Sequence, residues 1–536
     1  MIPDNGIRRF GDDGAKGSRP SEPFYEFRLD DMIPQGHLLR RIDVFVSDVL
    51  GDLHEQLGPF YSDIGRPSID PELLIRMHLV GYCFGIRSER KLCEEVALHL
   101  AYRWFCRLDL DDKVPHHSTF SENRLNRFRE SDILRHIFER VVTAAMAMGL
   151  VKGEGFAVDA SVMEANASRY HGKAPGELDW TEKQRQKRAV AEYLTALEAE
   201  TTTEGDVPNE GDGGGPENKR QGRCERQQPK VISPSDPQSA WTAKANERVQ
   251  FGYGLNYLID IENAVIVDVE ATPARTYDEV AATRTMLNRT EERFALKPKR
   301  LAADTAYGTG KFLGWLVKEK KIIPHIPVWE KTDRKDGIFS RSDFRWDSKR
   351  GAYRCPNGKV LRTSGTVHDG RTLLYRASKR DCDVCPIRAK CCTTADARKI
   401  PRDLHEDARD VARRKMKTKA FARSRDERKR VEMRFAHLKT HHGFERMRLR
   451  GLSGARDEFH LAAIVQNLKT MALRLLGPPK AGVRINCLNG IGTSVIRRPG
   501  GDAHQDQDHP QAETLPDRKA DHVGPFFDGI DPEPTC

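Results

Sequence analysis

Phe156-Ala157-Val158-Asp159 is a short apolar run that ends in a carboxylate, and Leu301-Ala302-Ala303-Asp304 repeats that pattern later in the chain. Runs of this length between polar segments are typical of strands buried in a sheet. Each run therefore predicts a buried strand that delivers an aspartate at its end. The other predicted elements of the fold are placed relative to these two strands.

A third acidic residue lies in a strongly basic stretch, Arg428-Lys429-Arg430-Val431-Glu432, which is followed by Lys439. On a helix, Arg428, Glu432 and Lys439 occupy positions i, i+4 and i+11 and share one face. Carboxylates hold hard cations such as Mg²⁺ or Mn²⁺, and Lys and Arg bind phosphates. Two strand-end aspartates and this glutamate therefore fit metal-assisted phosphoryl transfer on nucleic acid.

The order of elements between these stretches predicts the fold class. Two strand-like runs, 251–261 and 264–269, are separated by Glu262-Asn263, a hairpin signal. A helix (278–294), a strand (300–304), a helix (311–320) and a proline-bearing edge strand (322–328) follow. This α/β order is that of a ribonuclease H-like fold. In that layout the first and fourth strands are neighbours, so Asp159 would lie beside Asp304 and Glu432 would arrive on the last helix.

The remaining segments complete the expected domain organisation. Residues 22–150 predict an all-α N-terminal domain, in which Asp70 and Ser88 begin helices and Arg124, Arg127 and Arg129 lie on one polar side. It could be a helix-turn-helix-like DNA binder or a bundle used for packing or dimerisation. The catalytic core would span 151–332 and 401–476. We expect disorder over 1–21, over an insertion at about 170–245 and over a tail at 477–536.

The charge composition of the chain favours a polyanionic partner. The 536-residue chain has a net charge of +10 and a pI of about 9.0, and residues 411–434 hold eleven Lys and Arg against three acids. Such a run is often only a solvated helix face, but here it leads into Glu432, which favours nucleic acid. No segment offers about 18 consecutive apolar residues. We therefore expect a cytoplasmic, nucleoid-associated protein with no membrane partner.

Cysteines concentrate in a separate segment, 333–400. Cys355, the pair Cys382 and Cys385, and Cys391 with its neighbour Cys392 lie within 38 residues. Two cysteines separated by two residues, together with two more thiols, match a tetrahedral structural Zn²⁺ site, with Cys391 or Cys392 as the fourth ligand. The alternative is a reduced cluster without metal. This Cys-rich insertion precedes the basic helix.

Taken together, residues 22–475 resemble a bacterial insertion-sequence transposase of the DDE type, most similar to the IS1182 group of the IS4/IS5 assemblage. Four stretches carry the resemblance: 65–71 with its following helices, 156–161, 303–308, and Arg428-x3-Glu432-x6-Lys439 continued by 450–451 and 466–468. The related pattern has a tyrosine three residues before the arginine. This chain has Arg425 there, so the role of that tyrosine is not carried over.

The resemblance implies a DNA transposase that cleaves the terminal repeats of its own element and joins them to target DNA. Asp159, Asp304 and Glu432 would hold Mg²⁺ or Mn²⁺, and Arg428 and Lys439 would contact DNA phosphates. Bringing two ends together makes a homodimer reasonable. Two alternatives remain open: a nuclease of the same fold that does not join strands, and an inactive, zinc-stabilised DNA-binding regulator. Asp260, Asp268 and Asp278 compete as ligands, although Asp278 could cap its helix and the other two could edge the hairpin.

Overall fold

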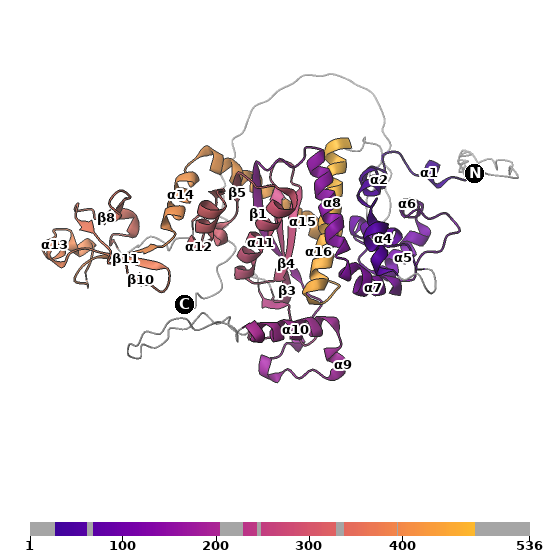
Figure 1. Cartoon of the computed structure of the whole chain (residues 1–536), viewed down its shortest axis with the longest axis horizontal. Coiled ribbons are helices and arrows are strands. Elements are labelled where there is room, and N and C mark those ends of the chain that lie inside the picture. The colour runs from indigo at the N-terminus through magenta and orange to yellow at the C-terminus, as the bar shows by residue number, and fades with distance from the viewer. Residues whose placement is uncertain are drawn as a thin grey trace, which may run out of the picture.

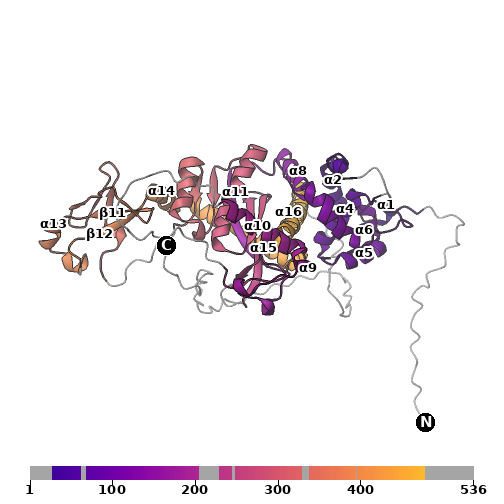
Figure 2. The ribbon, with the colours of Figure 1, turned by 60° about the horizontal axis from the view of Figure 1, so that its bottom comes forward.

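A mixed sheet lies at the centre of the computed structural model, which describes residues 27–61, 68–203, 229–243, 248–328, 337–393 and 395–476. The predicted disordered ends (1–21 and 477–536) and Gly65-Arg66-Pro67 lie outside these residues. Figure 1 shows the sheet between the N-terminal helices at one end and the Cys-rich segment at the other, and Figure 2 agrees with this arrangement from a second direction.

The sheet has the strand order β2-β3-β1-β5-β6, and β4 pairs with β3. Both strands of the predicted hairpin, β3 and β4, are present, and the proline-bearing strand β6 lies at the sheet edge as predicted. Prolines are tolerated there because an edge strand has one unpaired side. The strands are β1 (Gly155–Glu164), β2 (Ala240–Thr242), β3 (Gln250–Asp260), β4 (Ile266–Pro273), β5 (Arg300–Ala302) and β6 (Ile323–His325).

Strand β1 lies between β3 and β5, antiparallel to the first and parallel to the second. Phe156, Ala157 and Val158 are fully buried, as the apolar run predicted. The register pairs Ala157 of β1 with Ala302 of β5. Asp159 and Asp304 each lie two residues after this pair, in neighbouring segments of the sheet. The predicted adjacency of the first strand and the strand before Asp304 is confirmed.

The sheet is covered by helices from distant parts of the sequence. Helix α11 packs on β3 and β4, α15 runs along β1, β5 and β6, and α16 packs on β3 and β4. Helices α12 and α14 lie beside each other near β6. The bounds are α9 (Glu182–Arg185), α10 (Arg188–Thr203), α11 (Thr276–Phe294), α12 (Gly310–Gly314), α13 (Lys379–Asp383), α14 (Glu406–Met416), α15 (Lys419–His442) and α16 (Gly451–Leu476).

The N-terminal region is helical, and its buried side chains belong to the same continuous apolar core as the sheet. Helix α16 packs against α2, α4 and α8, which joins the two regions. Asp70 and Ser88 cap α4 and α5 by accepting from the backbone amides of Glu72 and Lys91, as predicted. The helices are α1 (Leu29–Met32), α2 (Leu38–Val49), α3 (Leu53–Leu57), α4 (Pro71–Phe84), α5 (Glu89–Leu98), α6 (Leu100–Phe105), α7 (Ser118–Asn123) and α8 (Ile133–Ala147).

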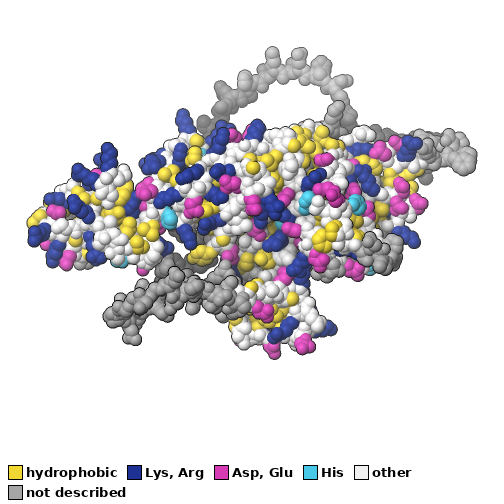
Figure 3. Space-filling model, viewed as in Figure 1, with side chains coloured by type: hydrophobic (Ala, Val, Ile, Leu, Met, Phe, Trp, Pro, Cys, Tyr) yellow, Lys and Arg dark blue, Asp and Glu magenta, His cyan; other side chains and the backbone are white. Residues whose placement is uncertain are grey.

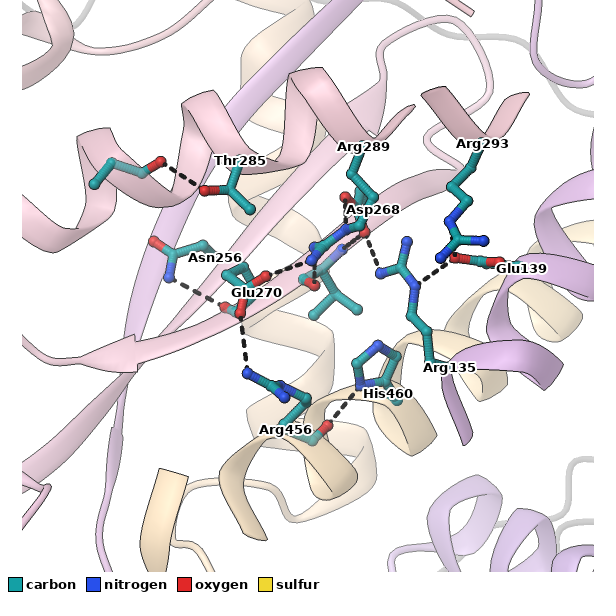
Figure 4. A network of polar contacts seen from close by, with 12 residues as sticks. Arg135, Glu139, Asn256, Asp268, Glu270, Thr285, Arg289, Arg293, Arg456 and His460 are labelled. Atoms are coloured by element: carbon teal, nitrogen blue, oxygen red, sulfur yellow. Dashed lines mark hydrogen bonds and ion pairs between the residues drawn. The ribbon is translucent and has the colours of Figure 1, made fainter. Parts of the chain in front are cut away.

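A buried ionic network connects α8, the sheet and α11 (Figure 4). Asp268 on β4 is fully buried and forms ion pairs with Arg135 of α8 and, at 2.9 Å, with Arg289 of α11. Arg289 also reaches Glu270 at 2.7 Å. A buried carboxylate between two guanidinium groups is compensated in place, so Asp268 is structural and does not compete for a metal.

The prediction of disorder over about 170–245 is wrong for the residues that the structure describes, 170–203 and 229–243. Helix α10 packs on α16, and its Glu192 accepts a hydrogen bond from Ser453 at 2.5 Å. Asp236 is fully buried and accepts from the Tyr253 hydroxyl and the Gly451 amide. Glu192 and Asp236, two charged residues of the segment predicted to be a solvated insertion, therefore have tertiary partners. Residues 204–228 and 244–247 lie outside the described part.

The Cys-rich segment forms two small sheets with an apolar core of their own, built around Phe344, Tyr353, Leu361, Tyr375 and Ile400. The segment lies between β6 and α14 in the sequence, and its apolar core is separate from the core beneath the central sheet. The strands are β7 (Arg345–Asp347), β8 (Ala352–Arg354), β9 (Val360–Leu361), β10 (Val367–His368), β11 (Thr372–Arg376) and β12 (Lys399–Asp403). None of the helices described has the length and apolar character needed to cross a membrane.

Candidate active site at the centre of the sheet

Two aspartates meet where β1 and β5 run side by side. Asp159 lies within β1 and accepts a hydrogen bond from the Ala160 amide at 2.9 Å. Asp304 follows β5 and caps the short helical turn η5 (Thr305–Tyr307) by accepting from the Ala306 amide at 2.8 Å. Both carboxylates are partly buried. Asp304 follows its strand as predicted, but β1 continues past Asp159 to Glu164, so the prediction that Asp159 ends its strand is wrong. The register of β1 with β5 nevertheless brings the two aspartates to one region of the sheet.

Helix α15 brings a cation and a third carboxylate to this location. Arg428 lies 3.5 Å from an oxygen of Asp159 and 3.0 Å from an oxygen of Glu432, one helical turn away. Because the Arg428 guanidinium contacts both carboxylates, it connects α15 to β1. The predicted common face of Arg428 and Glu432 is confirmed. Lys439, farther along α15, donates a hydrogen bond to the Val162 carbonyl of β1 at 3.5 Å.

The electrostatics of the site oppose full ionisation of the carboxylates. Burial raises the pKa of Asp159 to about 6, although Arg428 acts to lower it and Asp304 adds to the rise. Burial also raises the pKa of Asp304, against the hydrogen bond from the Ala306 amide. Clustered carboxylates repel each other in a partly desolvated site, so a bound cation would relieve a real cost.

The sequence did not reveal a fourth carboxylate, Glu279, in the first turn of α11. Burial, together with the negative charges of Asp304, Asp159 and Asp278, raises the pKa of Glu279 to about 8. An acidic residue in a first helical turn normally only complements the helix dipole, so Asp278-Glu279 gave no signal of its own. The three-dimensional packing of α11 against η5 is what brings Glu279 to the aspartates.

The three competing aspartates have other roles. Asp260 accepts from the amides of Glu262 and Asn263 and holds the hairpin turn, as predicted. Asp268 lies within β4 and is paired with two arginines, so the prediction that it edges the hairpin is wrong. Asp278 does not cap α11, because the helix begins at Thr276 with Arg275 at the N-cap position.

The oxygen-rich site has the donor chemistry that Mg²⁺ and Mn²⁺ require, since Asp159, Asp304, Glu279 and Glu432 offer only carboxylate oxygens. As the side chains stand, the described residues contain no group of three His, Cys, Asp or Glu arranged to hold an ion. In this arrangement the guanidinium of Arg428 compensates Asp159 and Glu432 directly. The donor set is therefore of the kind that a divalent cation takes, and in this structure Arg428 compensates part of its charge.

The thiols of the Cys-rich segment surround one small cavity of about 20 Å³, lined by Cys355, Cys382, Cys385, Cys391 and Cys392. Cys382, Cys391 and Cys392 are buried. Burial raises the pKa of Cys391 to about 11, and the neighbouring thiols of Cys392 and Cys382 contribute. All five thiols predicted from the spacing lie at this cavity.

Comparison with known families gives two matches. Residues 27–126 match the family described as "Transposase domain (DUF772)", and residues 354–472 match "Transposase DDE domain". The second match contains Arg428, Glu432, Lys439 and the cysteines, whereas Asp159 and Asp304 lie between the two.

The other comparisons add little. No curated protein matches the chain. Among solved structures, the piggyBac transposase synaptic complex with hairpin DNA is 9% identical, covers 82% of this chain and 76% of its own, and has a TM-score of 0.30. That likeness is too weak to support an argument about fold or function.

Proposed function

This chain is a DDE-type DNA transposase of the insertion-sequence class, and on that premise we propose that Asp159, Asp304 and Glu432 are its three catalytic carboxylates. Two observations support the proposal: the β1–β5 register, which pairs the residues just before Asp159 and Asp304, and Arg428, which contacts both Asp159 and Glu432. The strand order around β1 supports a ribonuclease H-like catalytic core, and the motif spacing supports the IS1182 group.

In the proposed mechanism the three carboxylates hold Mg²⁺ or Mn²⁺. Asp159, Asp304 and Glu432 would hold the divalent ions, and such ions, when bound, would activate water or a 3′-hydroxyl for attack and stabilise the leaving 3′-oxygen. Arg428 exchanges its carboxylate partners for a DNA phosphate, which frees Asp159 and Glu432 as ligands. Lys439, two to three turns along the same helix, contacts the backbone farther from the scissile bond and fixes its register.

The substrate in this proposal is double-stranded DNA, at the element ends and at the target. The basic helices α14 and α15 and the Cys-rich segment carry many exposed Lys and Arg side chains, and those over the Cys-rich segment are visible in Figure 3. This distribution suits a polyanionic partner. The N-terminal helices would bind the ends or pair two subunits, and a homodimer would hold two ends together. We place this activity in the cytoplasm, on the nucleoid.

A labelled element-end duplex tests the proposed function. With Mg²⁺ the purified protein should cleave at the element end and join that end to a target plasmid, and EDTA should prevent both. Cleavage without any joined product would favour the nuclease alternative. Specific binding with neither reaction would favour the DNA-binding regulator.

Lys439→Ala should weaken end binding without changing sequence preference, because a phosphate contact carries no base information. The slope of log affinity against log salt concentration should fall by about 1, the value for one lost phosphate contact. Lys299→Ala is the matched control, since Lys299 precedes β5 and pairs with Glu154 at 2.7 Å. An unchanged slope for Lys439→Ala would remove this residue from the DNA interface.

We also propose that the Cys-rich segment binds a structural Zn²⁺ through Cys355, Cys382, Cys385 and either Cys391 or Cys392. The spacing of the cysteines along the chain and the cavity that all five of them line support this proposal, although as the side chains stand no three described thiols are arranged around an ion. Metal analysis of the purified protein should give about one zinc per chain, and Cys382→Ser should lose it. Absence of zinc from the wild-type protein would leave the cluster as reduced thiols in an apolar core.

A further inference from the structure

The Cys-rich segment has a second pocket, next to the thiol cavity, with a volume of about 560 Å³. One wall is the turn after β8 together with β9, and the other is the end of β11 with the start of α13. These elements lie at the end of the molecule beyond α14 (Figure 1). The charged and hydroxyl side chains that line this pocket are those of Lys359, Arg362, Arg376, Ser378 and Asp381.

Two arginines of this pocket lie directly opposite each other. Arg362 and Arg376 form an antiparallel bridge between the two small sheets, and each backbone amide donates to the other residue's carbonyl, at 3.0 and 2.8 Å. Side chains paired in this way leave the same face of a sheet, with Cβ atoms about 5 Å apart. The fold therefore holds two like charges next to each other, an arrangement that is destabilising unless an anion compensates it.

No described carboxylate compensates the two arginines. Both side chains are exposed, and neither Arg362 nor Arg376 forms an ion pair with a residue that the structure describes. Asp381, the acid that lines the pocket, is paired with Lys359 at 3.1 Å. Ser378 occupies the N-cap position of α13, but its hydroxyl makes no capping hydrogen bond. The pocket therefore offers two guanidinium groups and a hydroxyl, which are the donors that phosphates accept from.

The Cys-rich segment is anchored to α14, which contacts β6 and the basic helix α15. Glu406, fully buried at the start of α14, pairs with Arg341. Arg402 of β12 pairs with Asp407 at 2.5 Å and donates to the Tyr353 hydroxyl of β8 at 3.0 Å. These contacts preorganise the pocket relative to α15, and preorganisation lowers the entropy cost of binding one extended ligand at both places.

We propose that this pocket binds the sugar–phosphate backbone of duplex DNA away from the scissile bond, with Arg362 and Arg376 contacting phosphates. The inference rests on the proposed function for the identity of the polyanion, which is the double-stranded DNA bound at the active site. A phosphate beside the two guanidinium groups relieves their repulsion. Since backbone contacts carry no base information, the pocket adds affinity for any duplex equally.

The salt dependence of DNA binding by the full-length protein tests the inference. For Arg362→Ala/Arg376→Ala, the slope of log affinity against log salt concentration should fall by about 2, one unit for each lost phosphate contact. The fall should be the same for the element-end duplex and for an unrelated duplex of equal length. Lys349→Ala/Arg350→Ala is the matched control and should keep the wild-type slope. It removes two exposed cations from the turn between β7 and β8, at the opposite end of β8 from the pocket.

An unchanged slope for Arg362→Ala/Arg376→Ala, or an equal fall in the control, would overturn the inference. Arg362→Lys/Arg376→Lys keeps both charges and should keep the slope. A fall in this variant as large as in the alanine variant would mean that the lost charge is not the cause, and would overturn the inference as well. Cleavage of the element end by the wild-type protein reports on the proposed function separately. If the wild type does not cleave while the slope falls in the alanine variant alone, the proposed function is wrong and the pocket is still a DNA-binding site.

Discussion

Asp159→Ala or Glu432→Ala should lower the rate of strand cleavage by at least about 10²- to 10³-fold, the usual cost of removing one electrostatic group from an active site. Affinity for the element end should change little, because cations, not these carboxylates, meet the phosphates. Single-turnover cleavage of a labelled end and a gel-shift titration measure the two quantities separately.

Asp426→Ala is the control for this pair of substitutions. Asp426 lies on α15 less than two turns before Glu432, its side chain is 60% exposed, and its nearest cations are 3.8 Å away. We expect this variant to cleave at the wild-type rate. Metal-dependent nicking that survives Asp159→Ala or Glu432→Ala would remove that residue from the catalytic set.

Asp268→Ala should destabilise the protein by about 3–5 kcal/mol, since it leaves two guanidinium groups near the core without their shared partner. Arg135 and Arg289 both pair with Asp268, and they come from α8 and α11 (Figure 4). The loss should appear as a lower melting temperature and an earlier midpoint in urea.

Glu262→Ala provides the comparison for Asp268→Ala. Glu262 lies in the turn before β4, and its ion pair with Lys152 is 3.3 Å long and more than half exposed on both sides. Exposed pairs contribute about 0–1 kcal/mol, so the melting temperature should change little. Equal stability losses in the two variants would show that the buried network does not hold α8 and α11 to the sheet.

The parts of the fold that follow from local patterns could be predicted from the sequence. Apolar runs gave β1 and β5, the signal at Glu262-Asn263 gave the hairpin, and Asp70 and Ser88 gave two helix starts. Arg428 and Glu432 share a face because residues four positions apart are neighbours on the surface of any α-helix. The adjacency of Asp159 and Asp304 followed from element order, because it fixes which strands pair.

Features that depend on long-range packing could not be predicted. Glu279 reaches the site only because α11 packs against η5, and nothing beside it in the sequence differs from an ordinary first helical turn. The segment that includes α10 looked like a solvated insertion because its anchors, such as Ser453 for Glu192, are more than 250 residues away. Asp268 looked like a hairpin residue for the same reason, since Arg135 lies 133 residues earlier.

The N-terminal helices show a further limit of patterns along the chain. Their amphipathic spacing predicted an all-α N-terminal domain but not what covers its buried faces, which continue into the core beneath the sheet through α16. Arg87 illustrates the connection, because it pairs with Glu458 of α16, which is 2% exposed. Periodicity identifies a buried face but not the element that covers it.

Cleavage of the polypeptide by bound Fe²⁺ tests most directly whether the scattered acids converge. Fe²⁺ accepts oxygen ligands, and with ascorbate and peroxide it generates radicals that cut the backbone beside the ion. Our account predicts that Fe²⁺ on the DNA-bound protein cuts near Asp159, near Asp304 and near Glu432, and that excess Mg²⁺ suppresses all three cuts together. Cuts near one of these residues alone, or cuts that respond to Mg²⁺ independently, would contradict a common site.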